Sequence, residues 1–339
     1  MPEVSVIIAA YQAESYLEQA IKSILCQSFT DWELIIVDDA STDKTAAIAA
    51  QWAECDKRIK LLRNAQNLGP AASRNRAVAQ AQSPLLAFLD ADDIAYPQKL
   101  ARQVEFMRSH PKVGAVAHWI DIVDVHGNPH AEQWEWRREK DSHLPVFLLF
   151  HNVFALSAVM MRKSIWEQTE GFPLDLPPCE DFALWIAVAK ISQLHILPEK
   201  LGARREVPES LSNQKALAQQ QHLRILSNQL KQLGIIPSQK QMELHQQLRH
   251  RQFIPTDEFA AQARQWLEWL LKQNNSYRIY PKQPFTEVLG EIWYDYWHLR
   301  HKEGISILPR YFASPLWRGN NLQKNLLLIA LAFKRWIMP

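Results

Sequence analysis

The first hundred residues of the chain alternate between two hydrophobic periods, and this alternation restricts the fold more than any other feature. Four short runs are apolar and rich in Val, Ile and Leu, as expected of strands buried on both faces of a sheet. They are VSVIIAA (4–10), ELIIV (33–37), IKLL (59–62) and LLAFL (85–89). Helical spacing separates them at 17–25, after the N-cap cluster at 41–43, and at 71–81. The pattern predicts an α/β fold with right-handed crossovers and a mainly parallel sheet.

The rest of the chain predicts the completion of this domain and a helical C-terminal region. Residues 113–129 read as a strand followed by a turn, and residues 155–166 as a strand entering a helix. Beyond Pro208 the chain becomes Gln-rich, with two apolar stripes at helical spacing. The stripes are Leu223, Leu226, Leu230 and Leu233, and Phe259, Ala263, Trp266, Leu267 and Leu270. We place a domain boundary at 206–210, and expect Trp266 to lie in the core of the helical region.

Composition describes an ordered globular protein. The 339 residues are 47% apolar and 22% charged, and the net charge of +2 predicts no strong attraction to nucleic acid. Three cysteines without C-x-x-C spacing argue against disulfides and fit a reducing compartment. The N-terminus has no basic region before its short apolar run, and no stretch approaches about 20 apolar residues. We therefore expect a cytoplasmic protein, at most peripheral at the inner face of the cytoplasmic membrane.

Acidic or polar residues follow three of the predicted strands, at 12–14, 38–39 and 90–93. Ligands of parallel sheets bind beyond the carboxyl ends of the strands, so we expect these clusters to converge on one crevice. Single acidic residues there often only solvate a loop or cap a helix. The pair Asp90 and Asp92, however, suits a hard divalent cation that shares its oxygen ligands with phosphates. Neither G-x-G-x-x-G nor G-x-x-x-x-G-K-[ST] occurs, so a bound diphosphate would depend on a metal for neutralisation.

Three stretches carry a resemblance to a known family. They are VSVIIAAYQAESYLEQAIKSILCQSFTDWELIIVDDASTDKT (4–45), NLGPAASRNRAVAQAQSPLLAFLDADD (67–93) and GFPLDLPPCEDFALW (171–185). In this order and spacing they resemble the motifs of family 2 inverting glycosyltransferases, bacterial in type and with the GT-A fold. The resemblance covers about residues 3–213. It implies a GT-A domain over 1–205, with a nucleotide-binding half at 1–97 and an acceptor half at 98–205, before the helical region at 206–339.

The resemblance implies a nucleotide-sugar donor and residues that bind it. Ala9, Ala10 and Tyr11 would line the nucleotide pocket mainly through their backbone. Asp39 would accept a hydrogen bond from the base, and Arg74 would lie near the nucleotide. The first strand ends IIAAYQ where the family usually has Pro-Thr-Tyr-Asn, so the contacts of the base are expected to differ in detail.

The resemblance also implies a metal and a catalytic base. Asp92 would ligate Mg²⁺ or Mn²⁺ at the diphosphate, while Asp90 would reach the ribose or the water shell of the metal. Asp181 would deprotonate the acceptor hydroxyl, and Glu180 would shape that site. For Asp93, capping the helix that follows Pro97 is the simplest expectation.

The activity implied is transfer of one sugar, with inversion, from a UDP- or dTDP-linked donor to a saccharide or lipid-linked acceptor in cell-surface polysaccharide or glycolipid synthesis. The Q-x-x-R-W motif of processive relatives is absent: QARQW (262–266) has Gln in the Arg position. The first alternative is an inactive protein of the same fold that only binds a sugar nucleotide or a glycan. The second is a phosphatase of the haloacid dehalogenase type, but its D-x-D continues into Gly-Thr, whereas Asp92 is followed by Asp93 and Ile94.

Three tryptophans have two interpretations each. Trp185 either stacks on an acceptor sugar or packs in the core. Trp134 and Trp136 either contact the acceptor or belong to a half-buried strand.

The C-terminal stretch 308–339 predicts a surface contact. It contains five basic residues, no acidic ones, several aromatic residues and the apolar run LLLIALAF (326–333). Eight residues cannot span a bilayer, but an apolar run beside Lys, Arg and Trp suits a helix at the membrane interface. The alternatives are packing in the helical core and a homodimer contact.

Overall fold

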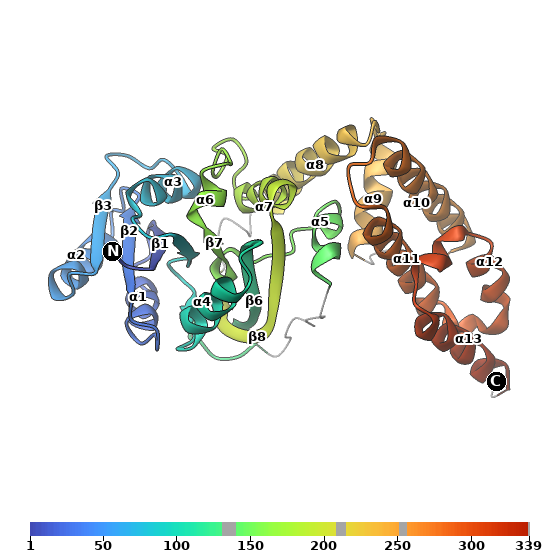
Figure 1. Cartoon of the computed structure of the whole chain (residues 1–339), viewed down its shortest axis with the longest axis horizontal. Coiled ribbons are helices and arrows are strands. Elements are labelled where there is room, and N and C mark those ends of the chain that lie inside the picture. Colours follow the sequence, from blue (N-terminus) through green and yellow to red (C-terminus); the bar gives the residue numbers. More distant parts are fainter. Residues whose placement is uncertain (131–139, 208–214, 251–255, 338–339) are drawn as a thin grey trace. The chain divides into compact units, whose positions relative to one another are not determined.

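The computed structural model describes residues 1–130, 140–207, 215–250 and 256–337, which belong to two compact units (Figure 1). The first unit contains residues 1–144 and 152–222, and the second contains residues 145–151 and 223–339. The short segment 145–151 therefore leaves the first unit and returns to it.

The first unit is built on one eight-stranded sheet. Its strands are β1 (Val4–Ala10), β2 (Trp32–Asp38), β3 (Ile59–Arg63), β4 (Leu85–Phe88), β5 (Ile94–Ala95), β6 (Val113–Val123), β7 (Met160–Arg162) and β8 (Gln193–Arg205). They lie in the order β3-β2-β1-β4-β7-β6-β8-β5. The β3-β2-β1-β4 half is parallel, as is the β6–β8 pair, while β7 is antiparallel to both of its neighbours and β5 is antiparallel to β8. The expected α/β fold with a mainly parallel sheet is confirmed.

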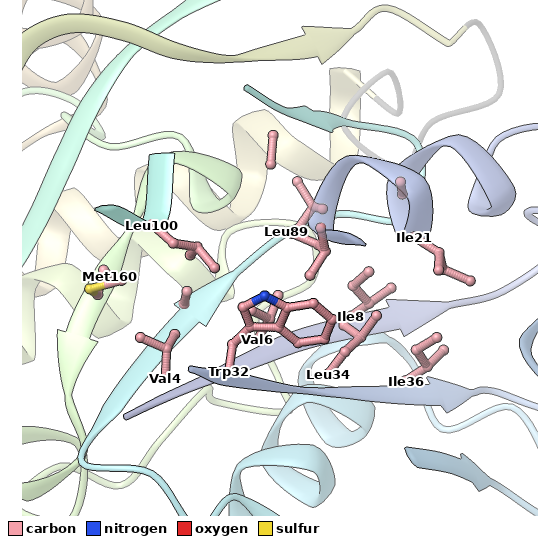
Figure 2. Packing of buried hydrophobic residues seen from close by; sticks show 14 of the residues in the cluster. Val4, Val6, Ile8, Ile21, Trp32, Leu34, Ile36, Leu89, Leu100 and Met160 are labelled. Carbon is pink, nitrogen blue, oxygen red and sulfur yellow. The ribbon is translucent and has the colours of Figure 1, made fainter. Parts of the chain in front are cut away.

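Strand β1 is apolar apart from Ser5 because both of its faces are covered. It lies between β2 and β4, so that Val4 is paired with Trp32 on one side and with Leu85 on the other. Val6 and Ile8 belong to a cluster that also contains Leu17 and Ile21 of helix α1 (Leu17–Leu25). Figure 2 shows this cluster, with the Trp32 indole among Val6, Ile8 and Leu34. Helix α3 (Pro70–Gln80) contacts β1 and β2.

The other helices of the first unit connect the strands or follow them. They are α2 (Thr45–Cys55), α4 (Lys99–Ser109), α5 (Leu144–Phe147, whose residues from 145 belong to the second unit), α6 (Lys163–Trp166), α7 (Glu180–Ile191) and the start of α8 (Lys215–Gln232). Helix α3 begins directly after Gly69, whose φ of +86° is a conformation that glycine adopts easily. Helix α7 begins at Glu180, so the two carboxylates of the predicted catalytic motif lie in its first turn.

The second unit is helical. It contains the rest of α8, α9 (Gln239–His250), α10 (Asp257–Tyr277), α11 (Lys282–Leu299), α12 (Leu308–Phe312) and α13 (Leu322–Ile337), together with short 3₁₀ turns. Its core is rich in aromatic side chains, and the prediction that Trp266 is a core residue is confirmed. The Trp266 indole donates to His245 Nδ1 (3.1 Å), and His245 Nε2 lies 2.9 Å from the Leu149 carbonyl. These contacts attach the segment 145–151 to this unit.

Burial decides between the two interpretations of Trp185. Trp185 is fully buried against Phe88 and Phe154, so it is a core residue and does not stack on a sugar. Trp134 and Trp136 lie outside the described residues. Within the described ranges, no helix combines the length and the apolarity needed to cross a membrane.

Candidate functional site

The carboxyl ends of β1 and β2 meet at one edge of the sheet, as the parallel order requires. Ala9 is paired with Val37 in the ladder, and the Ala10 carbonyl accepts a hydrogen bond from the Asp39 N–H (2.8 Å). The Tyr11 side chain is 51% exposed beyond the strand end. Gln12 and Ala40 have φ values of 50° and 59°, a conformation that is uncommon outside glycine and that clusters at functional sites.

The polar residues at 12–14 bind the chain itself. Gln12 Nε2 donates to Thr42 Oγ1 (2.9 Å), and the Lys44 N–H donates to Glu14 Oε2 (2.9 Å). The Ala13 N–H donates to the Thr45 hydroxyl. The side chains of Gln12 and Glu14 are therefore occupied by hydrogen bonds within the chain, and the convergence of this cluster on the crevice stays a prediction. Their side chains fix the loop between β2 and α2.

Asp39 is a buried carboxylate with three donors from the chain. The Leu68 N–H (2.9 Å) and Asn64 Nδ2 (2.6 Å) donate to Oδ1, and the Gly69 N–H (2.8 Å) donates to Oδ2. A carboxylate offers about four lone-pair positions, so about one remains for the N–H of a base. Asn64 also donates to Ser73 Oγ (2.9 Å), which connects the Asp39 cluster to α3.

Arg74 joins two of the predicted motifs. It lies on α3, is largely buried, and donates to Asp90 Oδ1 (2.8 Å) and Glu180 Oε1 (2.6 Å). The guanidinium fork thereby holds a carboxylate after β4 and one at the start of α7, 90 residues apart in sequence. Glu180 Oε2 is buried and has no hydrogen-bond partner among the described residues. A buried acceptor without a partner is costly, which fits an atom that meets a ligand hydroxyl.

Asp181 lies beside this network and is oriented by two donors. Asn152 Nδ2 donates to Oδ2 (2.9 Å), and the Phe182 N–H donates to Oδ1 (2.7 Å). Burial, and then the neighbouring charge of Glu180, raise the pKa of Asp181 to about 7, although the two hydrogen bonds and Arg74 act in the opposite direction. A carboxylate with a pKa near 7 is suited to accept a proton at neutral pH.

Asp90 and Asp92 lie in the turn after β4. Burial, and then the charge of Asp90, raise the pKa of Asp92 to about 6. The ionised form of Asp92 is therefore disfavoured, although Arg204 and Arg205 act in the opposite direction. Among the described residues, no group of three His, Cys, Asp or Glu side chains could hold a metal by itself. Two carboxylates fit a divalent cation that takes its other ligands from a diphosphate and water, which is the coordination typical of Mg²⁺ sites.

A buried hydrogen-bond network holds the turn at residues 90–93 in place. Asp93 Oδ1 accepts the Arg205 N–H (2.9 Å), and Arg205 Nε donates to the Asp92 carbonyl (2.9 Å). Lys99 Nζ donates to the carbonyls of Phe88 (3.0 Å) and Ser157 (2.6 Å). The expected capping role of Asp93 is wrong, because its carboxylate binds β8 and no side chain caps α4.

The structure thus joins Asp90 and Glu180 through Arg74 of α3. Asp39 is connected to the same helix through Asn64 and Ser73. The motifs did not indicate the supporting residues Asn64, Lys99, Asn152, Ser157 and Arg205. In the sequence, Asn152 is distinguished only by being polar in a largely apolar segment. This feature does not indicate that its partner is Asp181, 29 positions away.

The fold and the site define the class: an α/β domain of the GT-A type. S. aureus TarS (residues 1–349), solved with UDP-GlcNAc, is similar over 86% of this chain and 83% of its own at 18% identity, with a TM-score of 0.59. The Pyrobaculum calidifontis mannosyltransferase PcManGT, solved with GDP-Man and Mn²⁺, is similar over 100% of this chain and 88% of its own at 17% identity, with a TM-score of 0.55.

Sequence comparison gives the family. Residues 5–168 match the model of glycosyl transferase family 2. TuaG of Bacillus subtilis, a glycosyltransferase named for teichuronic acid biosynthesis, is 31% identical over 63% of this chain and 83% of its own length. Across four such relatives, the matched region covers 64%, 69%, 66% and 83% of their lengths. The chain belongs to glycosyltransferase family 2.

Proposed function

We propose that the chain transfers one sugar, with inversion, from a UDP- or dTDP-linked donor to a hydroxyl of a saccharide or lipid-linked acceptor in the synthesis of a cell-surface polysaccharide or glycolipid. The observation that carries the proposal is the bridge from Arg74 to Asp90 and Glu180, with Asp181 beside it. It joins the motif expected at the diphosphate to the motif expected at the acceptor. TarS with UDP-GlcNAc and TuaG with its named pathway support the donor and acceptor classes.

In this proposal Asp181 removes the proton of the acceptor hydroxyl as that oxygen attacks the anomeric carbon. Asn152 and the Phe182 N–H keep the carboxylate oriented, and Glu180 Oε2 accepts from another hydroxyl of the bound sugar. Asp39 and the backbone of Ala9, Ala10 and Tyr11 hold the nucleoside. One direct displacement inverts the anomeric configuration and needs no covalent sugar–enzyme bond.

Asp92 and Asp90 would hold Mn²⁺ or Mg²⁺. When bound, the cation supplies charge stabilisation to the departing diphosphate. The Mn²⁺ in PcManGT and the position of both carboxylates in one turn after β4 support this assignment. NMR analysis of the product is the test of the mechanism: a donor with an α-linked sugar gives a β-linked product, whereas an α-linked product would contradict direct displacement.

Asn152→Ala is expected to move the acidic limb of the pH–rate profile upward by about one to two pH units. A hydrogen bond to a charged group is worth about 1.5–3 kcal/mol and favours the ionised form, so its loss raises the pKa of Asp181 further. The matched control is Asn75→Ala, because Asn75 Nδ2 donates to the Phe172 carbonyl (2.8 Å) and not to Asp181. An unchanged limb in Asn152→Ala would show that Asn152 does not tune the base.

The predicted membrane contact of residues 308–339 stays a proposal, which the exposed side chains of α13 support. One face of α13 belongs to the core of the second unit through Leu328 and Ala332. Another face of the helix exposes Leu322, Leu326 and Phe333. Two basic residues of the stretch are paired within the unit, Arg310 with Asp257 and Lys324 with Glu291.

If this face of α13 binds the inner surface of the cytoplasmic membrane, Leu326→Gln with Phe333→Gln lowers sedimentation with anionic liposomes several-fold. Both side chains are exposed, so the fold should be retained. Ile191→Gln replaces an exposed apolar side chain of the first unit and is the control. Unchanged sedimentation would exclude this contact, and a shift from dimer to monomer in the double variant would assign the face to a homodimer.

A further inference from the structure

Two loops of the second unit meet at the end where α8 and α10 finish (Figure 1). We call them the paired loops: residues 233–238, between α8 and α9, and residues 277–281, from the last residue of α10 to the start of α11. An added Cβ on Gly234 would lie 2.2 Å from the Tyr277 hydroxyl, so the Tyr277 side chain lies directly against the first loop. The Tyr280 hydroxyl also donates to Gln229 Oε1 of α8 (3.1 Å).

Three large apolar side chains of the paired loops are exposed to solvent. Ile236 is 85% exposed, Tyr277 54% and Ile279 43%. Single exposed apolar residues are ordinary, but a group of three on adjoining loops is typical of an interaction surface.

The chain segments that carry these side chains are basic, although Gln239 and Gln283 donate to Glu243 and Glu287 one helical turn farther along. Neither residues 231–242 nor residues 271–286 contain an Asp or Glu. They contain five exposed cations: Lys231, Lys240, Lys272, Arg278 and Lys282. Across the described parts of the chain, none of these five side chains forms an ion pair or hydrogen bond. They differ in this from Arg310 and Lys324 near α13, which have acidic partners.

The backbone of both loops is fixed. Helix α8 ends with Gly234 at a φ of +71° and a hydrogen bond from the Ile235 N–H to the Leu230 carbonyl (3.0 Å), the arrangement of a Schellman motif. The buried Asn274 side chain binds both the N–H (2.9 Å) and the carbonyl (3.0 Å) of Tyr280. Ile236 and Ile279 therefore project from ordered loops.

Arg278 occupies an unfavourable position for its residue type. Its φ of 54° is the left-handed conformation that ends α10, where glycine or asparagine is usual. The side chain contributes no hydrogen bond or ion pair within the described structure that would explain its presence there. A cation at this position adds positive charge beside Tyr277 and Ile279.

We propose that the paired loops are a docking surface for an anionic lipid bilayer. Ile236, Tyr277 and Ile279 enter the interface, and the five cations face the anionic headgroups. Apolar and aromatic side chains surrounded by Lys and Arg are the composition that binds such interfaces. The surface lies on different elements from the exposed face of α13. It would place the enzyme at a surface that carries lipid-linked acceptors. Access to lipid-linked acceptors rests on the proposed function. Docking to the bilayer does not, because it needs neither donor nor acceptor.

The test is sedimentation of the full chain with vesicles of phosphatidylcholine alone or with 30% phosphatidylglycerol. We expect binding to the anionic vesicles only. Lys231→Gln with Lys282→Gln should weaken it about 30-fold, equivalent to about 1 kcal/mol for each lysine. Lys57→Gln with Lys190→Gln removes the same charge from exposed positions of the first unit and should leave binding within about twofold. Equal loss in both pairs would overturn the proposal, because only net charge would then matter.

Two further variants separate lipid docking from folding and from other anionic partners. Arg278→Gly relieves the left-handed conformation, so it should retain thermal stability while binding to anionic vesicles falls several-fold. Ile236→Ser with Ile279→Ser should weaken vesicle binding and leave binding to dextran sulfate unchanged. If the isoleucine pair binds vesicles as tightly as the unsubstituted chain, the surface is a site for soluble polyanions and the proposal is wrong.

Discussion

Asp181→Asn is expected to lower the rate of sugar transfer by about 10²–10⁴-fold while the Kd of the donor stays unchanged. This factor is the usual contribution of a positioned general base. The amide keeps the shape of the side chain and one of its two hydrogen-bond acceptors, but it cannot take a proton. Because Asp181 is held by Asn152 and the Phe182 N–H, away from the Asp39 cluster, the loss should be confined to the rate.

The pH dependence gives the same assignment a second test. The base works in its ionised form and its pKa is raised to about 7, so the rate should rise with pH up to about 7 and then level off. In Asp181→Asn this limb should disappear. Asp175→Asn changes an exposed carboxylate in the same segment and should leave both the rate and the limb unchanged. Loss of donor affinity in Asp181→Asn would place the residue in the nucleotide site instead.

Asp92→Asn is expected to abolish most transfer and to weaken Mn²⁺-dependent binding of the donor nucleotide. An amide is a poorer ligand for a hard cation than a carboxylate, and only Asp90 would remain. In EDTA, where neither protein holds a metal, the variant and the unsubstituted chain should bind the donor nucleotide equally well.

The fold should survive this substitution. Burial and Asp90 disfavour the ionised form of Asp92, so the neutral amide relieves repulsion in the turn and the Tm in EDTA should be unchanged or higher. Asp124→Asn, in the surface turn after β6, is the control for a lost carboxylate. Normal turnover of Asp92→Asn without added divalent ion would exclude the metal assignment.

The sheet could be predicted because its strands are buried on both faces. Burial of this kind produces short, unbroken runs of Val, Ile and Leu, and the helices between them keep helical spacing. The structure has β1 at Val4–Ala10, where the pattern predicts it, and β2 and β3 within one residue of the predicted bounds. Parallel order then requires that the ends of β1, β2 and β4 share one edge, which is why the positions of Asp39 and Asp90 could be anticipated.

The contacts between motifs could not be predicted in the same way. Arg74 reaches Glu180 across 106 positions, and Arg205 binds the turn at Asp92 across 113. Such pairs depend on how β8 and α7 pack, which local periodicity does not encode. Glu14 and Asp93 also follow strands, but their carboxylates accept hydrogen bonds from the chain itself. The local sequence around an acidic residue at a strand end is the same whether it binds a ligand or the chain. The paired loops escaped prediction because Ile236 and Ile279 lie in separate, short loops.

We expect this chain to turn over a sugar nucleotide with a divalent cation. The most direct measurement is release of nucleoside diphosphate from a panel of UDP-, dTDP- and GDP-linked sugars, with Mn²⁺ and with EDTA, after binding of each donor has been measured by thermal shift. The proposed mechanism predicts that at least one bound donor is consumed with Mn²⁺ and that its consumption stops in EDTA. A donor that binds with Mn²⁺ while none is consumed would show instead a protein that binds sugar nucleotides without transferring the sugar.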